Sequence, residues 1–72
     1  MYKVFGKPAC AFCEAAKREL TTRGISYEYV DISTDNDARE FVVTEMGFRT
    51  VPLIMNGDTL VGGFKELKAS LI

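Results

Sequence analysis

Residues 3–13 read KVFGKPACAFC, which predicts a short strand joined directly to a helix that begins at a cysteine pair. Residues 3–5 are rich in β-forming side chains, and Gly6 and Pro8 stop the strand. The motif CAFC at residues 10–13 follows where the strand gives way to a helix. The residues on either side of this junction predict the remaining strands and helices.

A helix is predicted over residues 12–23, because apolar side chains recur there at i, i+4 and i+8, namely Phe12, Ala16 and Leu20. Gly24 suits the residue that closes such a helix. Residues 25–32 predict a second strand, since apolar and aromatic side chains alternate with polar ones. Tyr27 and Tyr29 share one face of this strand, and packing explains them better than stacking on a ligand.

A second helix is predicted after residues 33–35, because Asp35 and Asp37 favour a helix N-terminus. Its apolar stripe, which Gly47 ends, consists of Ala38, Phe41, Val42 and Met46.

An apolar strand over residues 51–55 is entered through Pro52. Asn56-Gly57 predicts a two-residue hairpin turn into a strand at residues 59–61. Gly62-Gly63 breaks that strand, and a final short helix is outlined by Phe64, Leu67 and Leu71.

The predicted order is therefore β-α-β-α-β-β-α over a single domain, residues 1–72. The first βαβ unit implies a parallel strand pair, and the hairpin implies an antiparallel pair. The fold class is α/β, with one mixed sheet covered by helices.

Composition excludes several functions. A net charge of −1 without a basic run disfavours nucleic acid and anionic membrane surfaces as partners. No apolar stretch approaches membrane-spanning length, and the N-terminus does not resemble a signal peptide. We therefore expect a cytoplasmic monomer. The chain has no histidine, which removes the usual base of a Cys–His hydrolase and the usual additional ligands of a zinc site.

The cysteines at the helix start carry the strongest chemical signal. Residues three apart in a first helical turn bring their Cβ atoms close enough for a disulfide, and a helix N-terminus stabilises a thiolate. We expect the pKa of Cys10 to be lowered, further so if Lys7 lies near the sulfur. Cys10 would then attack a substrate disulfide, and the less exposed Cys13 would resolve the mixed disulfide. Phe12 offers substrates an apolar face beside the pair.

Two other interpretations of Cys10 and Cys13 are a pair of core cysteines and half of a metal site. A CxxC motif occurs in zinc ribbons and iron–sulfur sites, but here a second ligand pair is missing. A closed metal site would need ligands from another subunit, so we assign no metal-ligating residues. The motif beside a βαβ pattern favours the redox role.

The segment KPACAFC at residues 7–13 resembles the active-site segment of glutaredoxins, whose usual form is a KPxCPYC-like run. Thr50-Val51-Pro52 is similar to the TVP segment of that family, and Gly62-Gly63-Phe64 to its GG-aromatic turn. The three motifs come in the family's order and span nearly the whole chain. The resemblance implies the thioredoxin-like glutaredoxin fold, a four-stranded mixed sheet flanked by three helices.

The resemblance also implies roles for these segments. Pro52 would follow a cis peptide bond and face the cysteines, so that the backbone of Val51 can pair with an extended thiol peptide. Glutathione would be a co-substrate, with no cofactor bound. The Gly62-Gly63 turn would approach its γ-glutamyl end, whose carboxylate would meet Gly63, Phe64 and Lys65. Lys7 would lie nearer the glycyl carboxylate.

The chain departs from the glutaredoxin pattern at three positions. Lys65 stands where an acidic residue is frequent, Leu53 where a glutamine is common, and Ala11 in place of the proline between the cysteines. Gly47-Phe48-Arg49 before the TVP proline is similar to NrdH-type redoxins, which take electrons from thioredoxin reductase. Those usually carry a Trp-Ser-Gly-Phe turn, and this chain has no tryptophan.

The resemblance thus favours a thiol–disulfide oxidoreductase that reduces protein disulfides or glutathione mixed disulfides and is re-reduced by glutathione. Ribonucleotide reductase is a target that the resemblance implies. One alternative is re-reduction by thioredoxin reductase, and an alternative of another class is an iron–sulfur or zinc carrier bridged between two chains. Arg49, just before Thr50, is either a surface residue or one that grips a carboxylate or an acidic partner protein.

Overall fold

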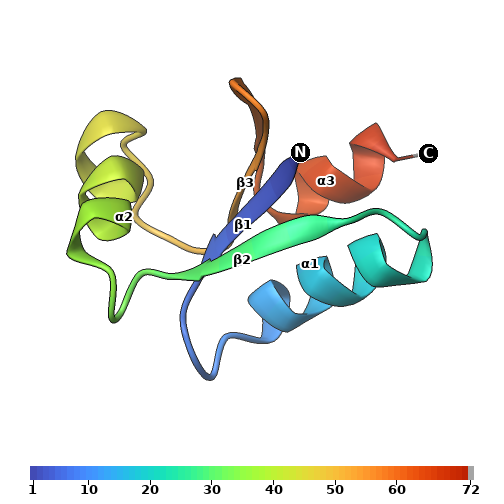
Figure 1. Cartoon of the computed structure of the whole chain (residues 1–72), viewed down its shortest axis with the longest axis horizontal. Coiled ribbons are helices and arrows are strands. Elements are labelled where there is room, and N and C mark those ends of the chain that lie inside the picture. The colour runs from blue at the N-terminus through green and yellow to red at the C-terminus, as the bar shows by residue number, and fades with distance from the viewer. Residues whose placement is uncertain (72) are drawn as a thin grey trace.

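A four-stranded sheet with helices on both faces organises residues 1–71, the part of the chain that the computed structural model describes (Figure 1). In chain order the elements are β1 (Tyr2–Gly6), α1 (Ala11–Thr22), β2 (Tyr27–Asp31), α2 (Asn36–Glu40), the π-helix η1 (Phe41–Glu45), β3 (Leu53–Asn56), β4 (Thr59–Gly62) and α3 (Phe64–Ser70). The predicted order of strands and helices is confirmed. The expected single domain over residues 1–72 stays a prediction, and its last residue lies outside the described part.

The sheet has the strand order β2-β1-β3-β4. β1 pairs in parallel with β2, as the βαβ unit predicts, and antiparallel with β3, which forms a hairpin with β4. The first strand is thus flanked on both sides, and its C-terminal end delivers the chain to the cysteine motif. Strand β2 is shorter at both ends than the predicted residues 25–32.

Alternate side chains of β1 enter two separate cores, because successive residues of a strand point to opposite faces. On one face Val4 packs with fully buried side chains of α1, β3 and α3, namely Ala16, Leu20, Ile54 and Leu67. On the other face Phe5 packs with buried side chains of α2, η1 and β3, namely Ala38, Val42, Leu53 and Met55. Helices α1 and α3 therefore cover one face of the sheet, and α2 with η1 covers the other (Figure 1).

Helix α1 begins and ends within one residue of the prediction. Cys10 is its N-cap, and Gly24 follows its end with a φ of 71°, the left-handed backbone that a glycine adopts without strain.

The second helix starts as predicted but continues as a π-helix from Phe41 onward. The Asp35 carboxylate accepts a hydrogen bond from the Ala38 N–H at 3.0 Å, which is the expected cap. The four-residue spacing of its apolar stripe predicts an ordinary α-helix, yet residues 41–45 form a π-helix. The Met46 N–H donates to the Phe41 carbonyl, five residues back, at 2.9 Å. The residues that follow this helix, Phe48 and Arg49, line the cleft beside Cys10.

The predicted Asn56-Gly57 turn is shifted by one residue. Asn56 is the last residue of β3 and pairs with Thr59, so the two-residue loop is Gly57-Asp58. Gly57 has a φ of 62°, and its N–H donates to the Met1 carbonyl at 3.0 Å. A glycine in the first loop position fits the positive φ that a tight hairpin requires there.

The cap of α2 is testable. We expect Asp35→Ala to lower the free energy of unfolding by about 1 kcal/mol, because the Ala38 N–H loses its acceptor. The measurement is urea denaturation at pH 7. Asp35→Asn is the matched control, since an asparagine caps equally well, and it should stay within a few tenths of a kcal/mol of the parent protein. Equal losses in both variants would contradict the cap.

Candidate functional site

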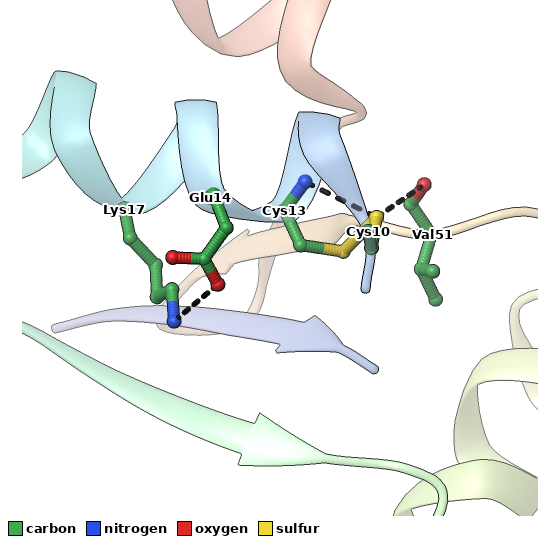
Figure 2. The surroundings of a disulfide bond; sticks show 5 residues. All are labelled: Cys10, Cys13, Glu14, Lys17 and Val51. Carbon is green, nitrogen blue, oxygen red and sulfur yellow. Dashed lines mark hydrogen bonds and ion pairs between the residues drawn. A yellow bond between two sulfur atoms is a disulfide. The ribbon is translucent and has the colours of Figure 1, made fainter. Parts of the chain in front are cut away.

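A disulfide joins Cys10 and Cys13 at the start of α1, with their Cα atoms 5.2 Å apart (Figure 2). Cys10 is the N-cap residue and is half-buried, whereas Cys13, in the first turn, is completely buried. Only the first sulfur is therefore placed to meet a disulfide from outside. This is the division between attacking and resolving cysteine that the sequence predicts.

The backbone at the helix start favours negative charge on the Cys10 sulfur. The Cys13 N–H lies 3.2 Å from that sulfur and points to it, and the N-terminal end of the helix carries a partial positive charge. The Val51 carbonyl oxygen, 3.8 Å away on the other side, acts in the opposite direction, because it can accept a hydrogen bond from a thiol but repels a thiolate. The N–H is nearer and acts together with the helix dipole, so the first turn dominates.

The Val51–Pro52 segment, which leads into β3, lies next to the disulfide at the start of α1. The Val51–Pro52 peptide bond is cis, as expected from the resemblance, and Pro52 is buried. Figure 2 shows the Val51 carbonyl directed at Cys10. Residues 41 positions apart in the sequence thus meet at the reactive sulfur.

A cleft and a groove flank this segment. The cleft, of about 270 Å³, is lined by Cys10, by the cations Lys7 and Arg49, by Thr50 and Val51, and by the apolar side chains of Ile32, Val42, Val43 and Phe48. The groove, of about 490 Å³, is lined by Phe12, Phe48, Thr50, Val51, Pro52, Gly63, Phe64, Lys65 and Glu66. The two hollows share Phe48, Thr50 and Val51, so they form one continuous surface beside Cys10.

Comparisons with known proteins agree with this geometry. The family model described as Glutaredoxin matches residues 3–61. The chain belongs to the glutaredoxin family. Glutaredoxin-like protein NrdH of Salmonella typhimurium is 32% identical over 62 residues, which cover 86% of this chain and 75% of the relative. Glutaredoxin 3 of Escherichia coli K12 is 30% identical over 67 residues, which cover 93% and 81%.

Solved structures share the fold. A buckwheat glutaredoxin in complex with glutathione superposes with a TM-score of 0.84 at 23% identity, over 97% of this chain and 66% of the buckwheat chain. The NrdH-redoxin of Escherichia coli superposes with a TM-score of 0.82 at 25% identity, over 99% and 92%. The thioredoxin-like glutaredoxin fold is confirmed, and this glutaredoxin-family protein is a thiol–disulfide oxidoreductase with a CxxC disulfide.

The structure gathers most of the residues that the resemblance assigns to glutathione. The groove brings together residues from α1, from the segment before β3 and from α3, with the Phe12 and Phe64 rings 5.9 Å apart. Lys7 lines the cleft on the other side and is exposed. Gly62 is the exception: it is buried at the end of β4 and lines neither hollow.

Two groove residues, Phe48 and Glu66, lie outside the predicted site. The Glu66 carboxylate accepts a hydrogen bond from the Gly63 N–H at 2.8 Å, a bond that caps α3. A glutamate three residues after the N-cap is a known capping pattern and was available from the sequence. Phe48 belongs to the Gly47-Phe48-Arg49 segment that resembles NrdH-type redoxins, but that resemblance did not assign it a place in the groove.

Within residues 1–71, no cluster of three or more His, Cys, Asp or Glu side chains is arranged to hold a metal ion. No helix in that part of the chain combines the length and the apolar character needed to cross a membrane.

Gly6 permits the close packing behind the buried cysteine. A Cβ on this residue would lie 2.8 Å from the Cys13 sulfur, 3.0 Å from the Tyr29 ring and 3.1 Å from its hydroxyl. A glycine therefore ends β1 because no larger residue fits between these side chains.

We expect Gly6→Ala to lower the free energy of unfolding by about 1–3 kcal/mol, because buried sulfur and ring atoms would have to move. Chemical denaturation of the oxidised protein measures the loss. A variant as stable as the parent would contradict the tight approach of Cys13 and Tyr29 to the backbone.

Proposed function

We propose that this chain reduces protein disulfides and glutathione mixed disulfides through Cys10 and Cys13, and that glutathione returns it to the dithiol form. The Cys10 thiolate attacks a substrate disulfide, one substrate sulfur leaves as a thiolate, and a mixed disulfide forms. The Cys13 thiolate then attacks Cys10, releases the second substrate sulfur and leaves the Cys10–Cys13 disulfide. Two glutathione thiols reduce that disulfide and become oxidised glutathione.

The observation that carries the proposed donor is the groove beside Cys10. Its Phe12 and Phe64 rings offer an apolar wall, and cations stand at both sides of the Val51 segment, Lys65 in the groove and Lys7 with Arg49 in the cleft. Glutathione is a short extended peptide with a carboxylate at each end. Cations on both sides of an extended backbone segment suit such a ligand. The γ-glutamyl end would lie toward Gly63, Phe64 and Lys65.

Protein substrates would use the same segment. Val51 stands between the two hollows with its carbonyl at Cys10, so an extended thiol peptide could align beside it as an added strand. Ribonucleotide reductase remains a proposed target by family resemblance, and the reducing cytosol is the proposed compartment because a vicinal dithiol turns over there.

A second candidate keeps the chemistry but takes electrons from thioredoxin reductase. Two observations favour it. The Glu66 carboxylate occupies the Gly63 N–H, one of the groups that a γ-glutamyl carboxylate would need, and Lys65 stands where an acid could meet the glutathione amine. Glutathione would have to displace Glu66 before it could use that N–H.

A coupled assay separates the two donors. With a disulfide substrate and NADPH, we expect turnover with glutathione and glutathione reductase that exceeds turnover with thioredoxin reductase alone, because Lys65 in the groove and Lys7 and Arg49 in the cleft suit a short peptide with two carboxylates. The rate of NADPH oxidation is the readout, with protein-free reactions as controls. Turnover with thioredoxin reductase only would refute glutathione as the donor.

The two cysteines differ in their expected mutational effects. Cys10→Ser should abolish all activity, because the exposed sulfur makes the first attack. Cys13→Ser should lose reduction of protein disulfides and retain turnover of glutathione mixed disulfides, which needs one protein thiol. Assays with insulin and with a glutathionylated peptide measure the two reactions. Equal loss of both in Cys13→Ser would refute the glutathione assignment.

A metal carrier bridged between two chains is the alternative of another class. It predicts a coloured or zinc-containing dimer that dissociates on chelation. Metal analysis and size-exclusion chromatography of the purified protein test it, and a metal-free monomer that retains oxidoreductase activity would dismiss it.

A further inference from the structure

In the second step of the exchange Cys13 must become a thiolate, and the first turn of α1 offers its sulfur no hydrogen-bond donor. Cys13 must lose its proton to attack, yet its side chain is completely buried, and burial in apolar surroundings disfavours a thiolate. The helix N–H that lies beside the Cys10 sulfur comes from Cys13 itself and is directed at the Cys10 sulfur. Some other group must stabilise charge there.

Tyr29 is the polar side chain placed to do so. The Cys13 sulfur and the Tyr29 hydroxyl oxygen lie 2.8 Å and 3.1 Å from one point, the position that a Cβ on Gly6 would take. Both atoms therefore border the space that the glycine leaves open, so the hydroxyl is near the sulfur without being bonded to it in the disulfide form. The Tyr29 ring reaches this place from β2, where it pairs with Val4 and packs on the core beneath α1.

The surroundings of the ring hold the pKa of Tyr29 above its ordinary value, so the phenol stays neutral. Burial raises the pKa of Tyr29, and the carboxylates of Asp31 and Glu14 act in the same direction, whereas the Lys17 ammonium lowers it. The hydroxyl therefore keeps its proton at neutral pH. The Lys17 ammonium lies 4.2 Å from the ring centre and pairs with Glu14 at 2.8 Å, so one cation polarises the phenol from the α1 side (Figure 2 shows Lys17 and Glu14).

We propose that Tyr29 is a positioning residue for the resolving step: its hydroxyl donates a hydrogen bond to the Cys13 sulfur as that sulfur becomes a thiolate. The proposal rests on the exchange chemistry assigned to Cys10 and Cys13 and does not depend on the donor. In this step the Cys13–Cys10 bond forms and the bond from Cys10 to the substrate sulfur breaks. The proton that Cys13 gives up to solvent is balanced by the one that the departing thiolate takes up.

The test is a single-turnover reaction of the reduced protein with a peptide disulfide, without any donor, quenched in acid and resolved by mass spectrometry. Tyr29→Phe keeps the ring and removes only the hydroxyl. We expect the mixed disulfide on Cys10 to accumulate, because the second step slows by about 10- to 100-fold, as for loss of a hydrogen bond to a charged group. The first-step rate should stay within about twofold, and the pH dependence of the second step should move to higher pH.

Tyr27→Phe is the matched control, since Tyr27 lies on the same face of β2, packs on the same core and lacks the contact with the Gly6 space. It should resolve the mixed disulfide at the parent rate. Lys17→Gln should slow the second step in the same direction as Tyr29→Phe, and Lys17→Arg should restore it, because an arginine keeps a cation over the ring.

An unchanged second step in Tyr29→Phe would overturn the proposal, and so would an equal slowing in Tyr27→Phe. Urea denaturation of each variant checks the fold, and the pH dependence separates an electrostatic effect from a loss of packing. If the reduced parent protein releases no peptide thiol and forms no Cys10–Cys13 disulfide, the exchange chemistry itself is refuted, and this outcome is distinct from a failure at Tyr29 alone.

Discussion

The contact between the Cys13 N–H and the Cys10 sulfur, at 3.2 Å, links the stability of α1 to the chemistry of the site. A helix N-terminus leaves N–H groups without partners, and an N-cap side chain normally satisfies one of them. Here the cap is the reactive sulfur. The same N–H that anchors the first turn therefore stabilises the charge that makes Cys10 a nucleophile, so the helix cannot be well capped without also activating the cysteine.

The pairing of the strands places Val51 and Tyr29 beside the cysteine pair. Because β1 pairs with both β2 and β3, its C-terminal end lies beside the segment that enters β3 and beside the Tyr29 side chain of β2. Val51 reaches Cys10 from one side and Tyr29 approaches Cys13 from the other. Each sulfur thus has its own polar neighbours, which is how two identical thiols one turn apart can act at different steps.

Local sequence signals predicted most of the fold, because they are read within a few residues. The periodicity of Phe12, Ala16 and Leu20 and the cap at Asp35 needed no tertiary information. The hairpin loop is shifted by one residue, with Asn56 paired to Thr59 and the Gly57 N–H bonded to Met1, and the second helix widens at Phe41 although its apolar spacing is regular. The cysteine pair was found from the motif, and its groove partners were named from family resemblance. The Gly6–Tyr29 approach depends on a contact between two strands, β1 and β2, which no local pattern encodes.

Membership of the glutaredoxin family does not determine the electron donor. The residues that bear on it are the charged side chains at the start of α3. The fold, the cysteine pair and the Val51–Pro52 turn suit either donor, since both reactions use an extended thiol substrate beside Cys10. The start of α3 differs: Glu66 satisfies the Gly63 N–H, while Lys65 adds a cation beside it. Glu66 is exposed, and a carboxylate ligand that took its place would make an equivalent hydrogen bond to the Gly63 N–H, so the exchange itself would cost little. With Glu66 displaced, Lys65 would attract a ligand carboxylate but repel a ligand amine, so the proposed glutathione donor depends on which of these two charges lies at the start of α3.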